Sequence, residues 1–151
     1  MRPFVLLMAC ACLSACVTNP FSSSGSELSL SPAGQDAYEV LREASFFSGA
    51  CVGIACTTPP TVEAFRILIG EPKADAAFKS LMREAPLEGQ LFGLVGVYYT
   101  DADRFDLYAA SYRRSNREVG FAQGCILGRE PVREVVAEIA DGTLPRSIRG
   151  G

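Results

Sequence analysis

The stretch that decides the fold is Leu91-Phe92-Gly93-Leu94-Val95-Gly96-Val97-Tyr98-Tyr99, which is apolar on every side. Nine residues are too few to cross a bilayer, which takes about 20 residues as a helix. We therefore expect this run to be the most deeply buried element of the core. A buried strand competes with a helix, because periodicity does not separate the two in so short a run. A helix is favoured, since Gly93 and Gly96 would let neighbouring helices approach closely.

The sequence on both sides of this run has the spacing of amphipathic helices. Ser31-Pro32 is a helix start, with Ser as N-cap and Pro at the first helical position. Thr58-Pro59-Pro60 starts another helix, and residues 131–140 form a last one that ends at Gly142. The expected inward-facing positions are Ala37, Val40, Leu41, Ala44, Phe47, Val62, Phe65, Leu68, Ile69, Ala74, Ala77, Phe78, Leu81, Met82, Phe105, Tyr108, Tyr112, Val132, Val135, Val136 and Ile139.

The connections between these helices are less regular. Thr100-x-x-Asp103 resembles a capping box and predicts the start of a helix. Ser115-x-x-Glu118 is a second such box, weakened by the glycines that follow it. We expect residues 48–56 to form a Gly-rich loop that carries two cysteines. Residues 119–127 are the least certain segment, and are predicted to be irregular or extended.

The sequence therefore predicts a mostly α fold with a single domain over residues 31–149. Ala64-Phe65-Arg66-x-Leu68 recurs as Ala77-Phe78-Lys79-x-Leu81. Short helices joined by Pro/Gly turns resemble the antiparallel pairs of HEAT- or TPR-like arrays. The repeat lacks the period and the signatures of those families, and an irregular helical bundle is the favoured alternative.

The N-terminus carries a processing signal. Arg2 is followed by an apolar run of about ten residues, the length of a signal-peptide core. This run ends in Leu13-Ser14-Ala15-Cys16, which resembles the lipobox of bacterial lipoproteins. The resemblance implies a signal peptide over residues 1–15, cleavage before Cys16, a diacylglyceryl thioether on that cysteine and usually an acyl chain on the new amino terminus. An ordinary secretory signal cut nearby is the alternative.

The segment after the lipobox is expected to be a lipidated flexible tether over residues 16–30. Its composition, rich in Ser with Asn, Pro and Gly, cannot bury enough apolar surface to order itself. As a coil it would span roughly 20 Å, and fully stretched about 46 Å. Two or three acyl chains hold a protein firmly to a membrane. Val17, in place of the Asp that resembles an inner-membrane retention signal, favours the outer membrane.

Three cysteines remain after processing: Cys51, Cys56 and Cys125. Outside the cytoplasm a disulfide is favoured. Chain entropy assigns about 4.4 kcal/mol to closing the loop from Cys51 to Cys125, and about 2.2 kcal/mol to closing Cys51 to Cys56. We therefore favour Cys125 paired with Cys51 or, slightly less, with Cys56. A redox role is disfavoured, because Cys-x₄-Cys is not the Cys-x-x-Cys of thiol oxidoreductases.

Composition excludes most catalytic and cofactor classes. The chain has no His, which removes Ser-His-Asp and Cys-His sites and imidazole metal ligands. Loss of Arg2 leaves 13 basic against 17 acidic residues, a net charge of −4, which does not suit nucleic acid. No phosphate-binding Gly-rich motif is present, and Asp101-x-Asp103-x-x-Asp106 lacks the Gly and Glu of a calcium loop. We expect no cofactor and no metal.

Two weak candidate sites remain. Tyr112, Arg113, Arg114 and Arg117 form a basic cluster beside an aromatic ring, a possible surface for an acidic envelope partner. Cations at a helix end also simply complement the helix dipole. Glu84 and Glu88 form a possible acid/base pair, although a solvated helix face explains them as well.

These observations predict a non-catalytic envelope lipoprotein, an accessory or protein-interaction module held to the membrane by its lipid. One alternative is a His-free, carboxylate-dependent hydrolase that acts on envelope polysaccharide through Glu84 and Glu88. Another is a structural component of the envelope with no discrete ligand.

Overall fold

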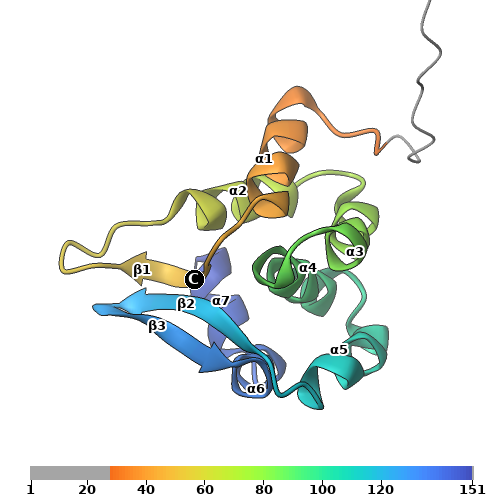
Figure 1. Ribbon diagram of the computed structural model, residues 1–151. Coiled ribbons are helices and arrows are strands. Elements are labelled where there is room, and N and C mark those ends of the chain that lie inside the picture. Colours follow the sequence, from red (N-terminus) through yellow and green to blue (C-terminus); the bar gives the residue numbers. More distant parts are fainter. Residues whose placement is uncertain (1–27, 151) are drawn as a thin grey trace, which may run out of the picture.

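A computed structural model describes residues 28–150 of the chain. The expected signal peptide, Cys16 and most of the expected tether lie outside these residues. Figure 1 shows a helical body from which a small sheet projects to one side. The helices are α1 (Pro32–Arg42), α2 (Pro60–Leu68), α3 (Ala74–Glu84), α4 (Leu87–Thr100), α5 (Phe105–Arg113), α6 (Val132–Ala140) and α7 (Thr143–Arg149), with a 3-10 turn, η1 (Ala102–Arg104), before α5. The strands are β1 (Phe47–Val52), β2 (Glu118–Gly124) and β3 (Ile126–Pro131).

Helix α4 is the centre of the core, as its apolar run predicts. Its residues from Leu91 to Val97 are all buried, and α3 packs along it more extensively than any other element. Gly93 and Gly96 make this approach possible. A Cβ on Gly93 would lie 2.7 Å from the carbonyl oxygen of Phe78, and one on Gly96 would lie 2.0 Å from the Phe78 ring. The expectation of a helix, and the role of these two glycines, are confirmed.

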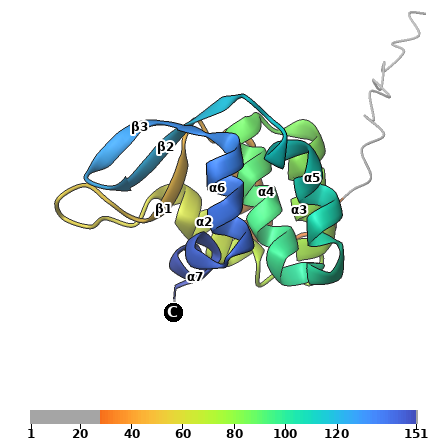
Figure 2. The same cartoon turned by 90° about the horizontal axis from the view of Figure 1, so that it is seen from below.

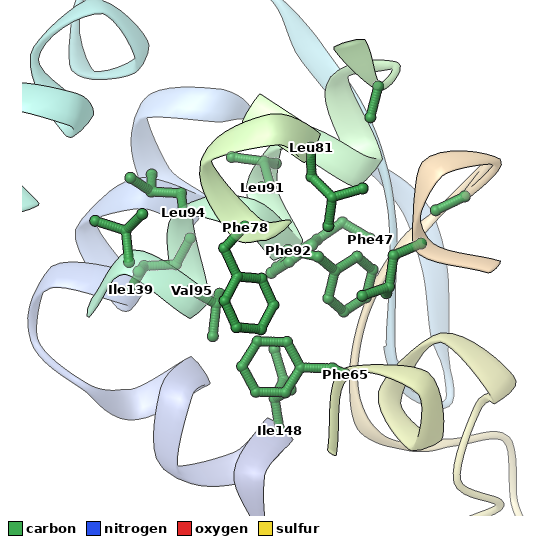
Figure 3. Packing of buried hydrophobic residues seen from close by; sticks show 14 of the residues in the cluster. Phe47, Phe65, Phe78, Leu81, Leu91, Phe92, Leu94, Val95, Ile139 and Ile148 are labelled. Carbon is green, nitrogen blue, oxygen red and sulfur yellow. The ribbon is translucent and has the colours of Figure 1, made fainter. Parts of the chain in front are cut away.

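Aromatic rings from four elements meet around α4 (Figure 3). Phe65 of α2 lies against Phe78 of α3, with ring centroids 5.2 Å apart. Phe47 of β1 lies against Phe92 of α4, with centroids 4.8 Å apart. The two phenylalanines of the faint sequence repeat are thus partners in one core.

The helix starts at Ser31 and Pro59-Pro60 are confirmed. The Ser31 side chain accepts a hydrogen bond from the backbone N–H of Gly34, and Pro32 occupies the first turn of α1. Both predicted capping boxes are wrong. Thr100 ends α4 and donates its hydroxyl to the Gly96 carbonyl, and Ser115 accepts from the Arg117 N–H in the turn that leads to β2. Helix α7, beyond Gly142, was not predicted.

The three-stranded sheet has the order β1-β2-β3, with β1 parallel to β2 and β2 antiparallel to β3. Residues 48–56 were expected to form a loop, and this prediction is wrong in part. The residues up to Val52 belong to strand β1. Of the two alternatives for residues 119–127, the extended one is correct. One face of the sheet meets α6 and α7, which lie beside it in Figure 2. The mostly helical class is confirmed, with this small sheet added to it.

Candidate interaction surfaces

The outer end of the sheet is built from two loops that lie side by side, residues 53–56 and 124–127, which we call the sheet tip. Both views show them projecting away from the helices (Figure 1 and Figure 2). The loop after β1 is closed by a disulfide between Cys51 and Cys56 and by reciprocal backbone hydrogen bonds between Val52 and Thr57. The Gly53 N–H donates to the Gly124 carbonyl over 2.7 Å, which joins the two loops. A disulfide and backbone hydrogen bonds therefore hold the two loops of the sheet tip together.

Aliphatic side chains cover the sheet tip and face solvent. Ile54 is 96% exposed, Leu127 69% and Ile126 67%. No charged residue occurs from position 44 to 62 or from 119 to 128, although 21% of the chain is charged. These two uncharged stretches are far apart in sequence and are brought together by the pairing of β1 with β2. No sequence motif marks this surface, but the spacing of charged residues along the sequence could have indicated it.

A groove of about 370 Å³ opens beside the sheet tip, between the end of α1, β1 and the start of α2. Most of its wall is apolar. Ser48 is the buried polar side chain of this lining, and its hydroxyl is hydrogen-bonded to the Thr61 hydroxyl over 3.1 Å. Glu43 is the one charged residue that lines it. The full lining is Val40, Glu43, Ala44, Ser45, Phe46, Ser48, Val52, Pro59, Thr61, Ala122 and Leu127.

The favoured disulfide pairing was wrong. Cys51 pairs with Cys56, their Cα atoms 4.5 Å apart, and Cys125 is free and exposed. The chain-entropy argument favours long loops but takes no account of native geometry. Here the tight turn after β1, closed by the Val52–Thr57 pairing, brings the two nearer cysteines together at the spacing that a disulfide needs.

The basic cluster lies at the C-terminal end of α5, at the opposite end of the molecule from the sheet tip (Figure 1). Tyr112 is half-buried and donates its hydroxyl to Gln90 over 3.0 Å, and burial raises the pKa of that phenol. Arg113 pairs with Asp106 at 2.7 Å and lies over the Phe105 ring. Arg114 and Arg117 are exposed and have no ion pair within residues 28–150. These last two side chains are the ones available to a partner.

A second cavity, of about 220 Å³, lies between β2, β3 and α6. Glu130, Glu134 and Glu138 line it above an apolar base that includes Phe121 and Val135. Partial burial raises the pKa of Glu138, and the negative charges of Asp141, Glu130 and Glu134 raise it further. The cluster follows from glutamates one turn apart on α6 facing a third on β3.

Glu84 and Glu88, the pair considered for catalysis, make structural contacts. Glu84 accepts a hydrogen bond from the Ser80 hydroxyl over 2.9 Å and a longer one from Tyr38. Glu88 accepts from the backbone N–H of Gly120 and so links α4 to β2. Neither carboxylate lines either of the cavities described above.

Within residues 28–150, no three Cys, Asp or Glu residues are placed to hold a metal ion. The same part of the chain has no helix with the length and apolarity needed to cross a membrane. No protein-family model, curated protein sequence or solved structure matches the chain.

Proposed function

We propose that the protein is a non-catalytic accessory lipoprotein of the bacterial cell envelope, held to the membrane by lipid on Cys16. The observation that carries this proposal is the order of the N-terminal sequence, in which an apolar run ends in Leu13-Ser14-Ala15-Cys16. Val17 after the lipid-bearing cysteine favours the outer membrane. In this proposal, the Ser-rich residues 16–30 are the tether between the lipid and the domain.

The folded domain acts, in this proposal, by binding another envelope protein. The absence of His and the structural contacts of Glu84 and Glu88 support a binding role over a catalytic one. The proposal does not depend on a HEAT- or TPR-like array of the helices. It places the partner on the basic cluster at the end of α5.

The charges of Arg114 and Arg117 support this placement. Both guanidinium groups are exposed, whereas Arg113 already has Asp106 as its partner. An Arg side chain can bind a carboxylate through two parallel hydrogen bonds, and Arg is enriched in protein interfaces. The expected partner therefore presents acidic side chains.

The test is site-specific photo-cross-linking in living cells, with a photoreactive amino acid at position 114. The matched control carries the same amino acid at position 133, where Arg133 is exposed on α6. The proposal predicts a reproducible protein adduct from position 114 that is absent from position 133 and is lost in Cys16→Ala. Equal adducts at both positions, or none from membrane-bound protein, would contradict a partner surface on α5.

A further inference from the structure

We infer that the sheet tip is a second, non-covalent membrane contact, in which Ile54, Ile126 and Leu127 enter the interfacial region of the lipid bilayer. The inference rests on the lipid anchor of the proposed function, because the anchor brings the bilayer within reach. It gives the domain a defined orientation on the membrane. The covalent lipid alone would leave it free to rotate on its tether.

The chemistry of the sheet tip suits lipid. Its large exposed side chains, Ile54, Ile126 and Leu127, are aliphatic, and the sequence from 44 to 62 and from 119 to 128 contains no charge that would have to leave water. Several polar backbone groups of the loop after β1 already have partners. The Gly53 N–H donates to Gly124, the Cys56 N–H donates to Gly53, and Val52 and Thr57 pair with each other. Insertion therefore removes apolar surface from water at a small cost in lost hydration.

Shape and composition favour a bilayer over a protein partner at this end of the molecule. The sheet tip projects from the helical body (Figure 1), and Ile54, Ile126 and Leu127 are exposed on it. The centres of protein interfaces are enriched in Tyr, Trp, Arg and Met. Residues 53–56 and 124–127 contain none of these four types.

The tether lets the sheet tip reach the bilayer. The residues from Val17 to Leu28 span at most about 40 Å when extended. A domain of this size has a radius of gyration of roughly 14 Å, so the extended tether is longer than twice that radius and is long enough to bring the sheet tip to the bilayer. Because the anchor confines the domain to this short distance, the effective concentration of lipid is high and weak contacts suffice. Contact through the sheet tip leaves the basic cluster of α5, at the other end of the molecule, free for a partner.

The chain supplies its own reporter, because Cys125 is free, exposed and part of the sheet tip. The full-length lipidated protein, with its disulfide intact, is labelled on Cys125 with an environment-sensitive fluorophore. It is reconstituted into vesicles of phosphatidylethanolamine and phosphatidylglycerol that contain a lipid-borne quencher. The matched control is Leu107→Cys combined with Cys125→Ser, which puts the label on α5 at an exposed aliphatic position away from the sheet tip.

The inference predicts a blue shift and strong quenching for the label on Cys125, and neither for the label at position 107. Burial of one aliphatic side chain raises the equilibrium constant for membrane insertion about tenfold. The double variant Ile54→Asp, Ile126→Asp therefore lowers this constant by about a hundredfold or more. Leu107→Asp leaves it unchanged. All three positions are exposed, so these variants are expected to fold.

Equal quenching at positions 125 and 107 overturns the inference. The mass of the N-terminal peptide, measured on the same preparation, reports the lipid on Cys16 independently. A lipidated peptide without preferential quenching refutes the sheet-tip contact and leaves the proposed function intact. A peptide without lipid refutes the anchor and, with it, the inference.

Discussion

Replacement of Gly96 by Ala tests the packing of α3 on α4. At an exposed helical site, Gly→Ala stabilises a protein by about 1 kcal/mol, because Ala has the higher helix propensity. Here the added Cβ would lie 2.0 Å from Cγ of Phe78 and 2.3 Å from both Cδ atoms. The Phe78 ring is fully buried and rests on Phe65, so it has little room to move.

The expected result is a loss of stability. Overpacking costs about 1–3 kcal/mol, and a contact this short belongs at the upper end of that range. After the gain in propensity is subtracted, Gly96→Ala should lower the free energy of unfolding by about 2 kcal/mol. For a domain of this size, this corresponds to a fall of roughly 8 °C in Tm.

The assay is denaturant and thermal unfolding of Gly96→Ala beside Gly128→Ala. Gly128 has no atom near its would-be Cβ and does not require a positive φ, so the control should change stability by less than about 0.5 kcal/mol. The double variant Gly96→Ala, Phe78→Leu should be more stable than the sum of the two single changes predicts. A rise in Tm for Gly96→Ala, or strict additivity in the double variant, would refute this account of the core.

Three further predictions concern the disulfide, an ion pair and a helix cap. Reduction of the Cys51–Cys56 disulfide should cost about 2 kcal/mol, whereas Cys125→Ser should leave Tm unchanged; thermal melts and non-reducing peptide maps check both. Lys79 donates to Asp75 and Asp101, and these bonds raise its pKa above the ordinary 10.5. The stabilisation of the fold by protonated Lys79 is complete below pH 10.5 and is lost as the pH rises above that value. The difference in Tm between wild type and Lys79→Met should therefore become smaller from pH 9 to 11.5. A Tm difference that does not change with pH would contradict this role of Lys79. Ser31→Ala should cost about 1 kcal/mol in urea unfolding through the lost cap of α1, and an unchanged midpoint would exclude that role.

The sequence predicted the helices whose signals are local. The run from Leu91 to Tyr99 is apolar on all sides and contains two glycines, which favoured a buried helix with close neighbours over the competing buried strand. Ser31-Pro32 marks the start of α1 because the cap and the first turn are adjacent in sequence. In such segments the neighbouring residues alone set the conformation.

The elements that were missed depend on distant partners. β1 has the sequence Phe-Ser-Gly-Ala-Cys-Val, with weak strand propensity, and it is extended because it pairs with β2. Thr100 was expected to cap a new helix, but it is the last residue of α4 and its hydroxyl donates to the Gly96 carbonyl, four residues earlier in that helix. In α7, Pro145 lies in the first turn, where a missing N–H is tolerated, although in sequence it marks a break.

The candidate surfaces also differ in whether their residues are neighbours in the sequence or only in the fold. The basic cluster is continuous in sequence, so its residues could be found, but the ion pair that occupies Arg113 could not. The sheet tip joins two stretches that only the sheet brings together, and its disulfide is set by a turn that cysteine spacing does not reveal.

The central claim, a lipid-anchored envelope module, is tested most directly by mass spectrometry of the N-terminal peptide from the membrane fraction of cells that produce the full chain. The account predicts a mature chain that begins at Cys16 and carries a diacylglyceryl group, and a Cys16→Ala variant without it that leaves the membrane fraction. A mature chain that begins elsewhere without lipid, or an unmodified Cys16, would contradict the account.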